Sequence, residues 1–229
     1  MLKVFAINGS PRKNFNTATV LQKALDGAKE VAQNHSMEIQ AEMINLYDLH
    51  FTGCMSCFGC KLLGGKSYGK CAIKDDLAPV FEKLADADVI IFGSPIYFSF
   101  ITGEMRSFLE RLCFQYYVYD INADSLAPKK SMTGFIYTMN CPAKMMEDIH
   151  YPDLFKVNEQ SIEKIFTKPE VLYVNDTYQF TDYSKYKMEY FKEEDKAKVR
   201  KEQFPIDCEN SFKLGSELTE RAIKQFHSK

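Results

Sequence analysis

The chain has 229 residues, 45% of them hydrophobic and 26% charged, an ordinary composition for one globular domain. Its formal net charge is −2 and it has no block of five or six basic residues, which argues against nucleic acid or an anionic membrane as its main partner. No apolar run approaches the ~20 residues of a membrane span. The first residues form a strand pattern and show no secretory segment, so we expect a cytoplasmic protein.

Strand-like and helix-like patterns alternate along the chain. Short apolar runs predict strands at residues 2–8, 37–44, 89–93, 132–139 and 171–174. Apolar residues at helical spacing predict helices from residue 17, after 75–76, after 102, around 161–167 and near 208–226. The charge-dense residues 185–203 indicate a further, solvated helix. Residues 45–71 have little periodicity and predict a long loop.

This alternation predicts an α/β fold with a flavodoxin-like, doubly wound parallel sheet of five strands in the order 2-1-3-4-5. Residues 1–180 would form this domain, and residues 181–229 a helical C-terminal extension packed on it. Ligands of such sheets bind outside the carboxyl ends of the strands, so the loops after Asn8, Gly93 and Met139 are the places to expect a site.

The loop after the first strand, residues 8–17, combines small, hydroxyl and basic residues in front of a helix. Backbone N–H groups and side-chain oxygens there could hold a phosphate at the helix N-terminus. The loop contains neither a P-loop nor a Gly-x-Gly-x-x-Gly pattern. An ordinary capped turn explains the spacing equally well.

The long loop carries four of the seven cysteines: Cys54, Cys57, Cys60 and Cys71. Four thiolates at this spacing suit a [4Fe–4S] cluster or a zinc ion, and the tight Cys-x-x-Cys-x-x-Cys run favours the cluster. Free thiols or an adventitious disulfide remain the alternative. An odd number of cysteines without an export signal does not indicate a disulfide framework.

Three motifs in this order resemble the NADPH-dependent FMN reductase and iron–sulfur flavoprotein family, over roughly residues 2–176. They are Gly-Ser-Pro-Arg-Lys-x-x-Asn-Thr at residues 9–17, the cysteine run, and Gly-Ser-Pro-Ile-Tyr-Phe at residues 93–98 with its following helix. The chain departs from the family in the long gap between Cys60 and Cys71. It also departs at residues 138–142, where many relatives have a glycine-rich turn.

The resemblance implies FMN as the cofactor and NAD(P)H as the electron donor. It assigns the FMN phosphate to Ser10, Arg12, Asn16 and Thr17. It assigns the isoalloxazine edge to Pro95, Ile96, Tyr97 and Phe98, and the third side of the flavin to Thr138, Met139 and Asn140. Tyr178 and Phe180, just past the fifth strand, could also reach the cofactor region, but packing is the favoured interpretation. No side chain is assigned a catalytic acid–base role, because the flavin itself carries out the redox chemistry.

We therefore expect an oxidoreductase that takes hydride from NAD(P)H and passes electrons to a flavin, a quinone or another small acceptor. One alternative is an iron–sulfur flavoprotein that exchanges electrons with a redox-protein partner. The other is a non-enzymatic module that binds a phosphate ligand or zinc. A homodimer or homotetramer is expected, since flavin edges in the resembling family are often completed by a neighbouring subunit.

Overall fold

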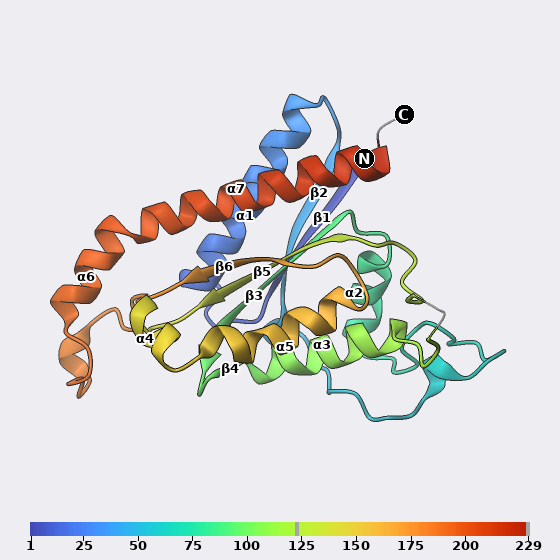
Figure 1. Ribbon diagram of the computed structural model, residues 1–229, viewed down its shortest axis with the longest axis horizontal. Helices are drawn as coiled ribbons and strands as arrows, with labels where there is room; N and C mark the ends of the chain where they lie inside the picture. The colour runs from blue at the N-terminus through green and yellow to red at the C-terminus, as the bar shows by residue number, and fades with distance from the viewer. Residues whose placement is uncertain (122–123, 228–229) are drawn as a thin grey trace.

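A twisted parallel sheet forms the centre of the protein in the computed structural model, which describes residues 1–121 and 124–227 (Figure 1). Its order is β2-β1-β3-β5-β6, and these strands span Ile39–Asn45, Leu2–Asn8, Val89–Tyr97, Met132–Thr138 and Glu170–Val174. The predicted order of five parallel strands is confirmed. A two-residue strand, β4 (Phe100–Ile101), adds to β3 in antiparallel fashion and was not predicted.

The central strands are apolar because both of their faces are covered. All seven residues of β5 and the first six of β3 are buried, as expected of strands packed between two helix layers. The edge strand β2 is only partly buried along most of its length. Burial is therefore deepest where β1, β3 and β5 lie side by side.

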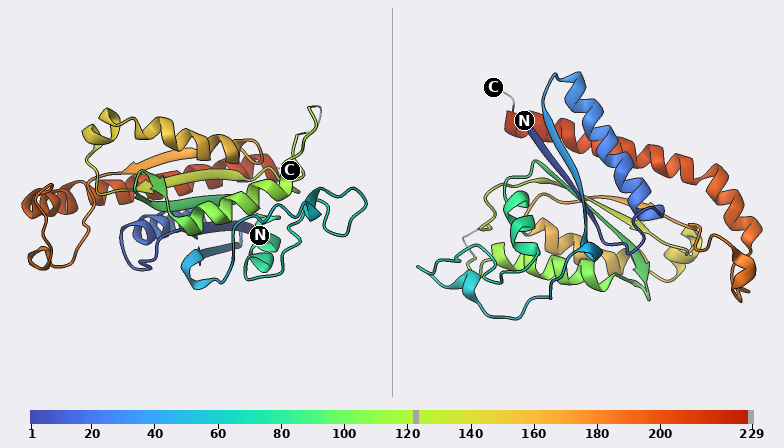
Figure 2. Two further views of the ribbon diagram at one scale, coloured as in Figure 1. Left: turned by 90° about the horizontal axis from the view of Figure 1, so that it is seen from below. Right: turned by 180° about the vertical axis from the view of Figure 1, so that it is seen from behind.

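Helices cover the sheet on both sides (Figures 1 and 2). Helices α1 (Asn16–Asn34) and α7 (Phe204–Ala222) pack on one face, and α2 (Leu77–Leu84), α3 (Gly103–Tyr116) and α5 (Tyr151–Glu163) on the other. The side chain of Thr102 accepts a hydrogen bond from the backbone N–H of Met105, which caps α3. Among the described residues, no helix is long and apolar enough to cross a membrane.

Several helix bounds differ from the predictions. Helix α5 begins at Tyr151, not near 161, because Pro152 suits the first helical turn and Phe155 begins the buried face. A short helix, α4 (Ala143–Asp148), precedes it. In the charge-dense segment, residues 186–192 are not helical and α6 spans only Glu193–Glu202. Helix α7 starts at Phe204, where Pro205 again lies in the first turn, and a π-helical turn (Ile223–His227) follows it.

Helices α1 and α7 approach each other unusually closely. A Cβ atom added to Gly215 would lie 1.9 Å from the carbonyl oxygen of Ala24, and one added to Gly27 would lie 2.1 Å from that of Phe212. Only glycine fits at this crossing. The C-terminal helix is therefore a packed part of the layer that covers this face of the sheet.

Candidate functional site

A pocket of about 130 Å³ lies at the carboxyl ends of β1, β3 and β5. The predicted cofactor residues, except Phe98, come together here from three separate loops. The complete lining consists of Ser10, Arg12, Phe15, Asn16, Thr17, Pro95, Ile96, Tyr97, Thr138, Met139, Asn140, Thr177, Tyr178 and Gln179. The structure thus brings together residues that are more than 100 positions apart in the sequence.

The loop after β1 is held in a defined turn. The backbone N–H of Ser10 donates to Asn8 Oδ1 at 3.0 Å, and that of Arg12 donates to Ser10 Oγ at 3.1 Å. Asn8 is itself fixed by a bond from its Nδ2 to Asn45 Oδ1 at 2.9 Å. The turn leads directly into α1, whose N-terminal N–H groups favour an anion such as a phosphate.

The loop after β3 is a tight hairpin. Phe98 and Ser99 both have positive φ, 47° and 73°, so the chain reverses there and pairs β3 with β4. Phe98 is fully exposed and does not line the pocket, whereas Pro95 and Ile96 do. Tyr97 lines the pocket while remaining 45% exposed.

Three threonines link the loops to one another. Thr102 Oγ1 donates to the carbonyl of Gly9 at 2.7 Å, and the backbone N–H of Thr102 donates to Ser94 Oγ at 3.1 Å. The hydroxyls of Thr17 and Thr138 lie 2.7 Å apart, and both residues are buried. These bonds hold the loops after β1, β3 and β5 at fixed positions around the pocket.

The segment Thr177–Gln179, which no sequence motif marks as part of the site, lies against the first loop. Arg12 Nη1 donates to the carbonyl of Gln179 at 2.5 Å, and Asn16 Nδ2 donates to that of Tyr178 at 2.8 Å. The sheet order could have indicated this contact, because the segment follows β6 and β6 lies next to β5. Tyr178 therefore lines the pocket, while Phe180 stacks on Tyr186 with ring centroids 3.9 Å apart.

Helix α6 contacts the loop after β5. Lys196, only 1% exposed, donates to the carbonyl of Asn140 at 2.5 Å and forms an ion pair with Asp176. One turn further along α6, Arg200 Nη1 donates to Asn16 Oδ1 at 3.1 Å. Helix α6 thus contacts both the first and the third of the loops.

The residues present fit a flavin mononucleotide. Asn140 Oδ1 and Gln179 Oε1 are buried acceptors with no partner in the described part of the chain, and both residues line the pocket. Such acceptors suit the ring N–H of a flavin, and Arg12 with the α1 N-terminus suits its phosphate. The pocket measures about 130 Å³, below the ~300 Å³ of typical ligand sites, so a bound FMN would extend beyond it.

The four cysteines of the long loop line a second, small cavity. It is formed by Cys54, Cys57, Cys60 and Cys71 together with residues such as Arg111, Phe114 and Gln115. Throughout residues 1–121 and 124–227, no group of three or more His, Cys, Asp or Glu side chains is arranged to hold a metal ion. The role of the four cysteines as metal ligands therefore stays a prediction from the sequence.

Positive charge and N–H donors surround these thiols. Lys61 Nζ donates to the carbonyls of Gln115 at 3.1 Å and Tyr117 at 2.5 Å, at the C-terminus of α3. Arg111 is 1% exposed and pairs with Asp75 through Nη2 at 2.9 Å. Burial raises the pKa of the Cys60 thiol, and the charge of Lys61 opposes this effect.

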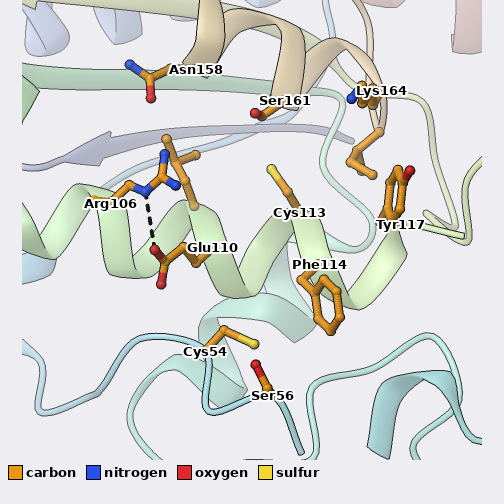
Figure 3. Close-up of a pocket in the computed structure, with 12 residues that line it drawn as sticks. Cys54, Ser56, Arg106, Glu110, Cys113, Phe114, Tyr117, Asn158, Ser161 and Lys164 are labelled. Atoms are coloured by element: carbon orange, nitrogen blue, oxygen red, sulfur yellow. Dashed lines mark hydrogen bonds and ion pairs between the residues drawn. The ribbon is translucent and has the colours of Figure 1, made fainter. Parts of the chain in front are cut away.

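A groove of about 470 Å³ lies over α3, between α5 and the cysteine loop, residues 45–71 (Figure 3). Arg106 and Glu110 pair across one turn of α3 at 3.2 Å, and Cys113, Phe114 and Tyr117 follow along the same helix. Burial raises the pKa of Cys113 to about 12, so its thiol stays protonated. Cys54 lines both this groove and the cysteine cavity. The pocket at the carboxyl ends of β1, β3 and β5, called the flavin-type pocket below, shares no lining residue with the groove.

Comparison with known proteins finds iron-sulfur flavoproteins among the relatives of this chain. The chain is 34% identical to an iron-sulfur flavoprotein of Methanocaldococcus jannaschii over 110 residues, which cover 48% of this chain and 51% of that protein. An iron-sulfur flavoprotein of Archaeoglobus fulgidus is also 34% identical over 110 residues, covering 48% of each chain. The match therefore spans only about half the length of these curated relatives.

Solved structures share the fold at low sequence identity. An NAD(P)H:quinone oxidoreductase from Methanothermobacter marburgensis superposes with a TM-score of 0.65 at 13% identity, covering 95% of this chain and 96% of that one. An azoreductase from Bacillus anthracis gives 0.61 at 14% identity, covering 95% and 100%. Residues 2–132, more than half of the sequence, match the family described as NADPH-dependent FMN reductase. The chain belongs to the NADPH-dependent FMN reductase family.

Proposed function

We propose that this protein is an FMN-dependent oxidoreductase that takes hydride from NAD(P)H and passes electrons to a flavin, a quinone or another small acceptor. The observation that carries the proposal is the single pocket in which Ser10, Arg12, Pro95, Ile96 and Thr138 come together from three loops. The family match and the quinone oxidoreductase and azoreductase folds support it.

Bound FMN would supply the hydride-accepting chemistry, and the chain would supply binding and orientation. Arg12 and the N-terminal N–H groups of α1 would hold the phosphate. Backbone N–H groups of residues 95–99 would stabilise negative charge on the flavin edge, as preorganised donors do in other enzymes. Tyr97, half exposed at the pocket rim, would border the face on which a nicotinamide stacks.

The test is purification under anaerobic conditions, followed by an absorption spectrum and by oxidation of NADH and NADPH with FMN, menadione or an azo dye as acceptor. Flavin bands and acceptor-dependent oxidation are the expected result. If added FMN does not bind, the proposal is wrong. Light scattering on the same sample tests the predicted homodimer or homotetramer.

A second candidate function is an iron–sulfur flavoprotein that passes electrons to a redox-protein partner. It is favoured by the cavity that all four cysteines line and that no carboxylate lines. Each cysteine of a [4Fe–4S] cluster binds a different iron atom, so the ligands are more widely separated than those of a single ion. About four irons and four sulfides per chain are expected, and a metal-free flavoprotein would leave only the first candidate.

A further inference from the structure

Two side chains at the cysteine cavity have buried N–H groups without a full hydrogen bond in the described structure, and the Arg111 guanidinium lies within reach of the Cys71 thiol. These N–H groups are Gln115 Nε2 and Arg111 Nε, on residues that are only 2% and 1% exposed. A buried donor without an acceptor destabilises the folded chain, and more so when the group is charged. Both residues line the cavity that the cysteines line, so a shared acceptor there would satisfy both.

The other atoms of these side chains are already bonded, which fixes where the free N–H groups lie. Gln115 Oε1 accepts from the backbone N–H of Cys71 at 2.9 Å. The Nη atoms of Arg111 are used by Asp75 and by the carbonyl of Thr52, the latter at 3.2 Å. The Gln115 amide therefore accepts from the Cys71 backbone through Oε1, while its Nε2 has no acceptor in the described structure.

The electrostatic surroundings favour a negatively charged acceptor. Lys61 follows Cys60 directly in the chain, and its ammonium is anchored on the last carbonyls of α3. The residues that line the cavity include Arg111 and no Asp or Glu. Neutral thiols are weak acceptors, whereas thiolates and the sulfides of a cluster are anionic and accept N–H hydrogen bonds.

We infer that Gln115 Nε2 and Arg111 Nε donate hydrogen bonds to sulfur atoms of an iron–sulfur cluster held by Cys54, Cys57, Cys60 and Cys71, and thereby raise its reduction potential. The inference rests on the second candidate function. Donors to cluster sulfur stabilise the more negative, reduced state, so removing one donor makes the potential more negative.

The experiment uses the full-length protein, reconstituted anaerobically with iron and sulfide, as wild type, Gln115→Met and Gln115→Glu. Gln115→Met removes the amide at similar volume, while Gln115→Glu keeps an oxygen for the Cys71 N–H. Gln22→Met on the exposed side of α1 is the matched control, because Gln22 bonds only to Asp26 in the described structure. Arg111 is left unchanged, since its ion pair with Asp75 is buried.

Three quantities are measured: iron and sulfide content, the cluster midpoint potential by redox titration followed by electron paramagnetic resonance, and the shift of the iron–sulfur resonance Raman bands in D₂O. Both Gln115 variants are expected to have a lower potential and a smaller D₂O shift than wild type and Gln22→Met. A loaded cluster whose potential and D₂O shift do not change in Gln115→Met overturns this inference alone. If no variant and no wild-type sample binds iron, the cluster proposal fails together with it.

Discussion

In the proposed function, Arg12 binds the FMN phosphate and not the flavin ring. It lies at the entrance to α1, where its guanidinium bonds to the carbonyl of Gln179 and stacks over Phe15 at 4.8 Å. A hydrogen bond to a charged group contributes about 1.5–3 kcal/mol, or roughly 10- to 100-fold in affinity. We expect Arg12→Ala to weaken FMN binding by this factor and to leave riboflavin binding unchanged, as measured by flavin fluorescence titration.

Lys13→Ala is the control for Arg12→Ala. Lys13 has a similar charge and sits next to Arg12, but it forms an ion pair with Asp48 and does not line the pocket. The affinities of the Lys13→Ala variant for FMN and riboflavin should both stay within about twofold of wild type, since exposed ion pairs contribute little. An equal loss of FMN and riboflavin affinity in Arg12→Ala would show that the residue supports the loop and does not bind the phosphate.

Motif order identified most of the pocket, but local backbone geometry decided which side chains line it. Phe98 belongs to the same motif as Ile96, yet its positive φ in the hairpin directs the side chain to solvent. No strand or loop pattern in the sequence specifies that turn. Conversely, Thr177–Gln179 has no motif and reaches the site only because β6 is placed beside β5.

At the scale of elements, α6 fastens the loop after β5. Its only buried side chain is that of Lys196, which bonds to the Asn140 carbonyl and to Asp176. Removing the ammonium leaves Asp176 without its ion pair and the carbonyl without its donor. We expect Lys196→Met to weaken FMN binding severalfold and to speed amide hydrogen exchange in residues 138–141.

Lys198→Met, two residues along the same helix, serves as the matched control because Lys198 is exposed. It should change neither FMN affinity nor exchange. If Lys196→Met speeds exchange and FMN affinity stays at the wild-type value, α6 stabilises the loop without contributing to the cofactor site.

The crossing of α1 and α7 gives a prediction about stability. Gly215→Ala places a methyl group against the backbone of Ala24, and overpacking of this kind costs about 1–3 kcal/mol. We expect the free energy of unfolding in urea to fall by that amount. Gly103→Ala, at the start of α3 with open space around its Cα, should change it by less than about 1 kcal/mol, in the stabilising direction.

The sequence predicts the type of an element where one hydrophobic periodicity dominates. It does not predict where a helix begins when the helix signals are weak. The buried strands β1, β3 and β5 are short, largely apolar runs and were expected close to where they lie. The starts of α5 and α7 depend on Pro152 and Pro205 in the first turn, a signal that the apolar pattern alone does not contain. The close α1–α7 contact depends on Gly27 and Gly215, whose pairing only the folded chain reveals.

In the whole molecule, helices cover the two faces of the sheet but not the carboxyl ends of its strands, where the loops of the pocket lie. The layer of α1 and α7 lies on one face of the sheet, and α3 lies on the other (Figure 2). Residues of α3 line both the groove of about 470 Å³ and the cysteine cavity. The flavin-type pocket occupies the edge of the sheet between these two faces. A ligand in this pocket would therefore contact the family motif at residues 9–17 and also residues 177–179, which the family match does not cover.

Global stability should also depend on pH through one buried carboxyl group in α7. Asp207 is buried, its Oδ1 accepts from Gln203 at 2.8 Å, and its Oδ2 has no partner among the described residues. Burial raises the pKa of Asp207, and the bond from Gln203 offsets this only in part. The folded chain therefore keeps this proton at a pH at which the unfolded chain has lost it, and its stability falls as the pH rises through that interval.

Asp207→Asn cannot titrate, so the variant should be close to wild type in stability near pH 3 and increasingly more stable than wild type as the pH rises from about 4 toward neutrality. The free energy of unfolding, measured in urea at a series of pH values, checks this. Asp148→Asn, on the exposed end of α4, is the control and should give a constant difference from wild type. A constant difference for Asp207→Asn as well would mean that the buried carboxyl group keeps its ordinary proton affinity in the folded chain.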